Sequence, residues 1–145
     1  MNASNAQKHP KSWVRTLQRK LYCAAKAMLG RKFGVLYDKV TAPETLKEAW
    51  KRVSRNGGAP GIDRQSIKEI KEYGVCKFLG ELENDLHENS YKANVIKRVY
   101  IPKDERNVRP LGIPTIKDCV MQMAVKLVIE PLFEAGLQDC SHGFR

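Results

Sequence analysis

The chain has 145 residues, 42% of them hydrophobic, which is enough for one modest core and for one domain at most. The formal net charge is +10. Residues 1–40 contribute +8 of it, from nine basic and one acidic side chains, so we expect a polyanionic partner or an anionic surface. No apolar run is long enough for a membrane span or a signal peptide, which excludes a membrane-embedded class and leads us to expect a cytoplasmic protein.

Residues 1–10 are polar, and we expect them to form a disordered tail. For residues 11–40 we expect a basic N-terminal extension built on an amphipathic helix, which Gly30 or Gly34 would end. The apolar positions at helical spacing are Trp13, Leu17, Leu21, Ala25 and Met28. The basic positions that could bind RNA are Lys11, Arg15, Arg19, Lys20 and Lys26. From these residues alone, the helix could lie on RNA, on an anionic membrane or on a partner protein, or simply face water.

A second helix is predicted to begin with a capping box that runs from Thr41 to Glu44 and to end before Gly57. Its apolar face holds Leu46, Ala49, Trp50 and Val53. The loop GGAPGID follows, and its three glycines allow a backbone to approach a nucleic-acid strand closely, while Asp63 is placed to cap the next helix. The candidate template contacts are Gly57, Gly58, Pro60 and Gly61. The alternative is that this loop only turns the chain.

Two short packing helices are predicted next. The first has an apolar face of Ile67, Ile70 and Tyr73, and the second one of Val75, Phe78, Leu79, Leu82 and Leu86. Acidic residues on the second helix are scattered around it, which predicts a solvated face and no metal site. The four cysteines lie far apart and form no C-x-x-C pair, so we expect reduced, structural thiols without zinc or disulfides.

A β-hairpin is predicted around residues 95–114. Residues 95–103 alternate with a period of two, residues 104–107 are turn-formers, and residues 108–114 read as a second strand that Pro110 and Pro114 restrict to an edge or a short pairing. Lys103 and Arg109 then lie near the same end of the hairpin. A triphosphate would find a point charge and a bidentate fork there. The alternative is an exposed, charged hairpin whose Lys and Pro residues prevent edge-to-edge aggregation.

The last predicted helix covers residues 116–137 and is apolar almost all round. Its polar residues recur at four-residue intervals and consist of Asp118, Gln122, Lys126, Glu130 and Glu134. This pattern predicts a largely buried helix with one wet edge, in which Pro131 should produce a kink.

The order of these segments resembles a known family. The run YIPK, a turn, RPLGIPTIKD and an apolar helix ending in EPLFEAGLQDCSHGFR is similar to the fingers region of reverse transcriptases encoded by bacterial group II introns. The block NGGAPGID is similar to an N-terminal block of that family, and the resemblance extends from about Arg31 to Arg145. The chain departs from the family at Arg64, which stands where the family usually has glycine, at Cys119 (usually Arg) and at His142 (usually Tyr).

The resemblance implies an α+β, mainly α-helical fold, in which residues 41–145 form the fingers region with a small antiparallel β-hairpin between helices. It implies that Lys103 and Arg109 contact the phosphates of an incoming dNTP. It also implies that the glycine loop covers template RNA and that the N-terminal helix grips intron RNA. Arg145 could face nucleic acid as well.

The chain has no adjacent Asp pair and no Asp-x-Asp, so we assign it no catalytic residue, no metal site and no cofactor. In the family, the palm carboxylates that hold Mg²⁺ lie beyond the SHGFR block. We therefore expect palm and thumb segments as partners, and no RNA-directed DNA polymerase activity from these 145 residues alone. The alternative is a non-enzymatic RNA-binding splicing cofactor, or an inactive truncated remnant.

Overall fold

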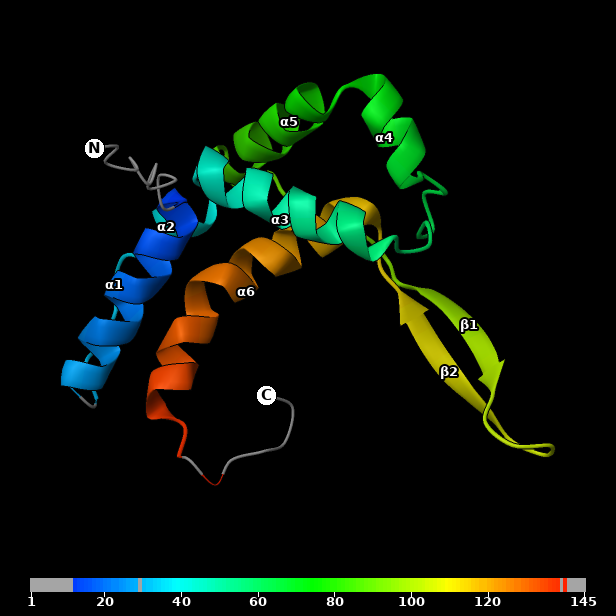
Figure 1. The fold of residues 1–145 in the computed structure, drawn as a ribbon. Coiled ribbons are helices and arrows are strands. Elements are labelled where there is room, and N and C mark those ends of the chain that lie inside the picture. Colours follow the sequence, from blue (N-terminus) through cyan, green and yellow to red (C-terminus); the bar gives the residue numbers. More distant parts are fainter. Residues whose placement is uncertain (1–11, 29, 139, 141–145) are drawn as a thin grey trace, which may run out of the picture.

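The computed structural model describes residues 12–28, 30–138 and 140. Within these residues the chain forms helices and one two-stranded antiparallel sheet, as the sequence predicts (Figure 1). The elements are α1 (Trp13–Ala27), α2 (Tyr37–Val40), α3 (Pro43–Asn56), α4 (Ile67–Tyr73), α5 (Val75–His87), β1 (Lys97–Pro102), β2 (Val108–Ile113) and α6 (Ile116–Gly136). The predicted tail at residues 1–10 lies outside the described residues.

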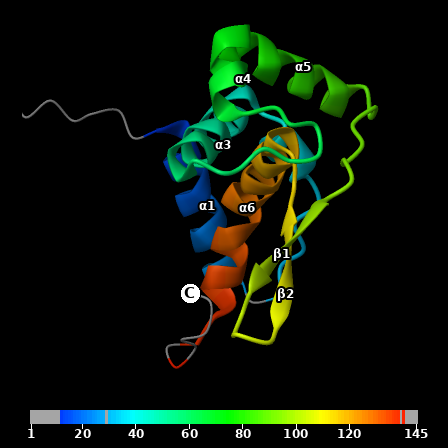
Figure 2. The ribbon, with the colours of Figure 1, turned by 90° about the vertical axis from the view of Figure 1, so that its right-hand side faces the viewer.

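Helix α6 is the centre of the core. It packs against α1 along one part of its length and against α3 along another, and α5 covers α3 from the other side (Figures 1 and 2). The predicted apolar face of α3 is buried, with Leu46 and Ala49 at most 1% exposed and the Trp50 ring centroid 5.7 Å from that of Phe78. Burial of this face against α6 and α5 is what stabilises α3, since a helix of 14 residues is marginal in water on its own.

The first helix is shorter than predicted. It begins after Ser12, whose hydroxyl accepts a hydrogen bond from the backbone N–H of Arg15 (3.3 Å), and it ends at Ala27, before either Gly30 or Gly34. Residues 31–36, which form neither helix nor strand, and the four-residue helix α2 then lead to α3. Helix α2 is too short to leave a periodic signal in the sequence.

Two predicted helix caps are wrong. Thr41 is buried beside the end of α2, where its hydroxyl donates to the carbonyl of Asp38 (3.5 Å), and Ala42 precedes α3 without a capping side chain. Asp63 does not cap α4. Its carboxylate accepts a hydrogen bond from the Gln65 N–H (3.2 Å), and Ser66 forms a capping box instead. A capping motif in sequence identifies a turn well, but a competing local partner decides which side chain caps.

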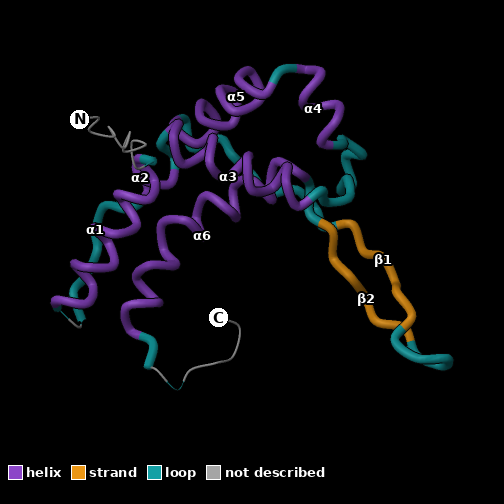
Figure 3. Tube along the Cα trace, in the orientation of Figure 1, coloured by secondary structure: helices purple, strands orange, loops and turns teal. Residues whose placement is uncertain are grey.

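Helix α6 remains helical on both sides of Pro131 and curves between its two packing partners (Figure 3). Proline lacks an N–H, so the carbonyl of Leu127, four residues earlier, loses its partner within the helix. The side-chain amide of Gln18, on α1, donates to that carbonyl at 3.0 Å. A polar side chain on the inner face of α1 thus satisfies the carbonyl that Pro131 leaves unpaired.

The hairpin projects from the helical body, and its two strands contact chiefly each other (Figure 1). The register pairs Ile101 with Arg109 and Tyr100 with Pro110, and the Lys103 N–H donates to the Asn107 carbonyl at 2.8 Å. Hydrogen-bonded and non-hydrogen-bonded pairs alternate along an antiparallel ladder, so Pro102 and Pro110 both fall at non-hydrogen-bonded positions. The prolines therefore remove no hydrogen bond between the strands. Because they have no N–H, they also hinder pairing of the outer edges of the ribbon with another strand.

Candidate nucleic-acid and nucleotide site

Lys103 and Arg109 both lie at the tip end of the hairpin. Arg109 pairs with Ile101 across the two strands and therefore shares its face. Lys103 lies just beyond the end of β1, in the turn, where its backbone N–H donates to the Asn107 carbonyl (2.8 Å). Arg109 is the second residue of β2, so the two cations flank the same turn. Both side chains are exposed. Two cations with long side chains can therefore converge on one anionic group.

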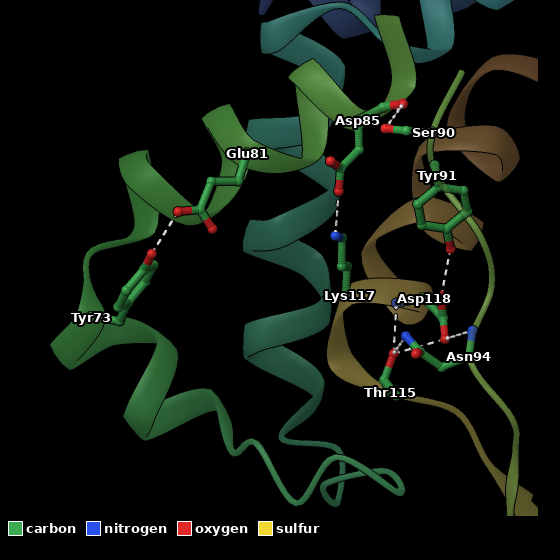
Figure 4. A network of polar contacts seen from close by, with 9 residues as sticks. All are labelled: Tyr73, Glu81, Asp85, Ser90, Tyr91, Asn94, Thr115, Lys117 and Asp118. Atoms are coloured by element: carbon green, nitrogen blue, oxygen red, sulfur yellow. Dashed lines mark hydrogen bonds and ion pairs between the residues drawn. The ribbon is translucent and has the colours of Figure 1, made fainter. Parts of the chain in front are cut away.

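A buried network anchors the base of the hairpin (Figure 4). Asp118, in the first turn of α6, is 4% exposed. One carboxylate oxygen accepts a hydrogen bond from the Tyr91 hydroxyl (2.5 Å), and the other accepts from the Asn94 N–H (3.0 Å) and the Thr115 hydroxyl (2.8 Å). Asn94 precedes β1 and Thr115 follows β2, so one carboxylate ties both ends of the hairpin to α6.

The electrostatics of this network favour an ionised Asp118. Burial by itself raises the pKa of the Asp118 carboxyl, but hydrogen bonds from Tyr91, Thr115 and Asn94 outweigh burial and hold the pKa below its ordinary value. Burial and the contact with Asp118 raise the pKa of the Tyr91 hydroxyl above its usual range. The prediction that Asp118 belongs to the wet edge of α6 is therefore wrong, whereas Gln122, Lys126 and Glu130 are exposed as predicted.

The glycine loop packs against the base of the hairpin. Gly61 is buried, and a Cβ atom built on it would lie 2.7 Å from the Cα and N atoms of Thr115. Gly61 therefore allows two backbones to touch, and its close contact is with this chain. Gly57 and Gly58 are exposed and Pro60 is half-buried. Gly57 ends α3 in the left-handed conformation (φ +62°), so it also has a local structural reason to be glycine.

The basic side chains of α1 form a stripe. Arg15, Arg19 and Lys26 recur at i, i+4 and i+11, together with Tyr22 at i+7, and this spacing places them along one side of the helix. All four are exposed, and Tyr22 is 38% exposed. The Lys26 ammonium also donates to the carbonyl of Ala135 on α6 (3.4 Å). Lys20 is exposed but lies off this stripe.

Part of the apolar side of α1 packs against the core of the protein. Val14 is buried, and Leu17 and Leu21 pack against the core, mainly through α6. Trp13 and Met28, which the sequence places on the same face, are 43% and 61% exposed. In this fold Val14, Leu17 and Leu21 face the protein, whereas both ends of the apolar side stay exposed. No described helix is long and apolar enough to cross a membrane.

The structure brings some predicted site residues together and separates others. The glycine loop and the hairpin base are in contact through Gly61, whereas α1 lies at the opposite end of the molecule from the hairpin tip (Figure 1). Lys11 and Arg145 lie outside the described residues. Among the residues that the structure describes, no three His, Cys, Asp or Glu side chains group so as to hold a metal ion.

The cysteines are free, but they are mostly not core residues. Cys23, Cys76 and Cys140 are exposed, and only Cys119 is partly buried against the core. Burial raises the pKa of the Cys119 thiol. The expectation of structural thiols therefore holds at Cys119 alone.

Sequence reasoning missed Tyr22 on the basic stripe and the residues that anchor the base of the hairpin. Tyr22 carries a signal, since an aromatic residue between cations at helical spacing is typical of nucleic-acid-binding surfaces. No sequence signal points to the partners of Asp118, because Tyr91 and Asn94 lie more than twenty residues away from it in the chain. Such a contact becomes visible only in the folded structure.

Comparisons with known proteins bear on the identity of the chain. No family model matches it. Protein YkfC of Escherichia coli K12 is 33% identical over 134 residues, which are 91% of this chain and 35% of that protein. The group II intron-encoded protein LtrA of Lactococcus lactis subsp. cremoris is 32% identical over 116 residues, which are 78% of this chain and 19% of that protein.

A yeast protein is also similar to this chain over a small part of its own length. The putative COX1/OXI3 intron 1 protein of Saccharomyces cerevisiae is 29% identical over 104 residues, 70% of this chain and 12% of that protein. The chain therefore spans about a third or less of the length of these relatives.

Proposed function

Because this chain belongs to the family of group II intron-encoded proteins, we propose that it forms the basic extension and fingers region of a reverse transcriptase and maturase. In this role α1 binds intron RNA, the loop from Gly57 to Gly61 borders the template, and the hairpin holds the triphosphate of an incoming dNTP. Polymerisation itself requires palm carboxylates and Mg²⁺, which other segments would supply.

The observation that carries the nucleotide role is the hairpin register. It puts Arg109 near the turn that holds Lys103, at the exposed end of a ribbon whose base is tied to α6 by Asp118. Lysine offers a point charge and arginine a planar fork, which together suit the oxygens of a triphosphate. The anchored base limits the directions in which the ribbon can point, which supports a role in positioning as well as in binding.

A chimera tests this role directly. We would replace the matching segment of the lactococcal protein with this chain and measure, for each variant, the KM for dNTP and the affinity for intron RNA. Lys103→Ala and Arg109→Ala should each raise the KM by roughly 10-fold or more, because a hydrogen bond to a charged group contributes about 1.5–3 kcal/mol. Affinity for RNA should change by less than about threefold if each residue contacts only the nucleotide.

Arg98→Ala is the matched control, since Arg98 is an exposed cation of the same ribbon on its opposite face. The clamp is contradicted if Arg98→Ala raises the KM as much, or if Lys103→Ala and Arg109→Ala weaken RNA binding as strongly as nucleotide use. A titration of the 145-residue chain with dNTP gives a second readout. Backbone amide resonances near residues 103 and 109 should shift, and those near residue 98 should not.

The basic stripe of α1 favours a second candidate, RNA binding without a role in polymerisation. Arg15, Arg19 and Tyr22 are exposed at the end of the molecule far from the hairpin tip, so they could hold RNA whether or not a nucleotide binds. A chimera that binds intron RNA through α1, and whose dNTP use does not depend on Lys103 or Arg109, would support this splicing-cofactor function.

A further inference from the structure

Thr115 is the point at which three parts of the fold meet. It is buried (0% exposed) and follows β2 at the start of α6, where its hydroxyl accepts a hydrogen bond from the Asp118 N–H (3.2 Å). The same hydroxyl donates to the Asp118 carboxylate (2.8 Å) and accepts from the side-chain amide of Asn94 (3.4 Å), upstream of β1. The third part is the glycine loop, since the backbone of Gly61 lies directly against the backbone of Thr115.

The contact between the glycine loop and Thr115 leaves no room for a side chain. A Cβ atom on Gly61 would lie 2.7 Å from the Cα and N atoms of Thr115 and 2.9 Å from the carbonyl carbon of Pro114. All three are backbone atoms, which cannot rotate away as a flexible side chain can. The φ angle of Gly61 is not positive, so its conformation does not itself require glycine. Glycine is required there because the loop approaches the base of the hairpin so closely that a shift of one must move the other.

The length of the ribbon magnifies any shift at its base. Thr115 is six residues after Arg109, a distance of about 20 Å along an extended strand, whereas neighbouring strands lie about 4.8 Å apart. A shift of about 0.5 Å at the base of one strand therefore turns the ribbon by about a tenth of a radian, which moves its tip by roughly 2 Å. Lys103 and Arg109 lie at that tip, so the contact of the loop with Thr115 fixes where the two cations point.

We propose that Thr115 is a positioning residue through which the glycine loop sets the direction of the hairpin, and with it the binding of nucleotide at the tip. The inference rests on the proposed function, which assigns the loop to the template and the hairpin to the triphosphate. A template strand that holds the loop against Thr115 also holds the hairpin in the direction that binds nucleotide. Thr115 and Gly61 do not touch the nucleotide, and both act through Lys103 and Arg109.

The direction of the ribbon is measured on the 145-residue chain from residual dipolar couplings of its backbone amides. Gly61→Ala, which places a methyl group against the backbone of Thr115, should change the orientation of residues 97–113 relative to α6. Gly58→Ala is the matched control within the loop, because a Cβ atom there meets nothing within 4 Å and φ is not positive. It should leave the orientation as in the wild type. An unchanged orientation in a folded Gly61→Ala protein would overturn the proposal.

The effect on nucleotide use is measured in the chimera with the lactococcal protein. At saturating template, Gly61→Ala should raise the KM for dNTP by roughly fivefold or more, since a misplacement of about 1 Å can cost up to about 100-fold in rate. In a background that also carries Lys103→Ala and Arg109→Ala, the same substitution should change the KM by less than about twofold, because it acts through those cations. Equal effects in both backgrounds would contradict the positioning role. Gly80→Ala adds a methyl group in open space on α5 and should leave the KM unchanged.

Two substitutions of Thr115 keep the test decisive if Gly61→Ala does not fold. Thr115→Val keeps the shape of the side chain but removes the hydroxyl that joins Asn94 to Asp118, so the ribbon should reorient and the KM for dNTP should rise by roughly fivefold. Thr115→Ser keeps the hydroxyl and should behave as the wild type. Equal KM values for the valine and serine variants would show that Thr115 does not position the hairpin.

The proposed function and the positioning role fail in different ways. If Lys103→Ala and Arg109→Ala leave the KM unchanged while Gly61→Ala still turns the ribbon, the nucleotide role of the hairpin is wrong and the structural link through Thr115 stands. If the two cations do affect the KM but Gly61→Ala does not, the nucleotide role stands and the positioning role is wrong.

Discussion

Arg64 has a left-handed backbone conformation, with φ +58°. A side chain with a Cβ atom is strained there by about 1–2 kcal/mol, whereas glycine is not. Arg64 stands at the position where the resembling family usually has glycine, and its N–H donates to the Gly61 carbonyl at 3.2 Å. The backbone conformation therefore accounts for a departure that the sequence alone could only record.

We expect Arg64→Gly to stabilise the protein by about 0.5–1 kcal/mol, because relief of strain exceeds the entropy that glycine adds to the unfolded chain. The measurement is the free energy of unfolding from urea titration. Gln65→Gly, at a neighbouring residue that lacks positive φ, is the control and should destabilise. A decrease in the stability of Arg64→Gly would show that the arginine side chain makes a compensating contact.

Asp118 should give the protein an acid-sensitive contribution to stability. Its pKa is lower in the folded state than its ordinary value of about 3.9, so this contribution is complete above that value and is lost as pH falls through the folded-state pKa. Asp118→Asn should destabilise by about 2 kcal/mol at pH 7, since the substitution removes hydrogen bonds to a charged group.

The measurement compares free energies of unfolding between pH 7 and pH 2. The difference between wild type and Asp118→Asn should shrink as pH falls below about 4, because protonation removes the charge in the wild type too. Asp63→Asn, at an exposed carboxylate, should differ little from the wild type. If Asp118→Asn lowered the free energy of unfolding by the same amount at every pH, the shape of the side chain, and not its charge, would stabilise the network.

At the scale of elements, α1 and α6 are joined by a polar contact inside an otherwise apolar interface. Gln18 donates to the Leu127 carbonyl, which Pro131 deprives of its partner within the helix. The contact explains why a glutamine lies on the packed side of α1. A hydrophobic pattern identifies that side but does not distinguish a necessary polar residue on it from an incidental one.

The two residues should be energetically coupled. Gln18→Ala should cost about 1–3 kcal/mol in the wild type, because a half-buried carbonyl loses its replacement donor. In a Pro131→Ala background the N–H of residue 131 returns, so the same substitution should cost at least about 1 kcal/mol less. Urea unfolding of the four proteins measures the coupling. Strictly additive effects would show that Gln18 does not serve this carbonyl.

At the scale of the whole molecule, the two candidate binding surfaces lie apart. The stripe on α1 and the hairpin tip occupy opposite ends of the fold, while the glycine loop contacts the hairpin base (Figure 1). An RNA that contacts both surfaces would have to span the helical body. The stripe should therefore govern the salt dependence of RNA binding independently of the hairpin tip.

We expect the double variant Arg15→Ala and Arg19→Ala to reduce the magnitude of the slope of log affinity against log salt by roughly 1.4. Each lost contact with a phosphate of single-stranded RNA reduces this slope by about 0.7, and the variant loses two. Fluorescence anisotropy with an intron RNA fragment, over a series of salt concentrations, measures this slope. Lys68→Ala on α4 is the control, since Lys68 is exposed but lies off the stripe. A slope that the double variant leaves unchanged would place the RNA contact elsewhere.

The sequence by itself determined the class of the fold, the apolar faces of α3 and α5, the end of α3 at Gly57 and the hairpin, because each depends on a short-range period or a local backbone preference. Tertiary structure alone decided the role of Asp118, the pairing of Gln18 with the carbonyl before Pro131 and the contact of Gly61 with Thr115. These features join residues far apart in the chain, and a polar residue or a glycine shows which partner it needs only when the elements pack together.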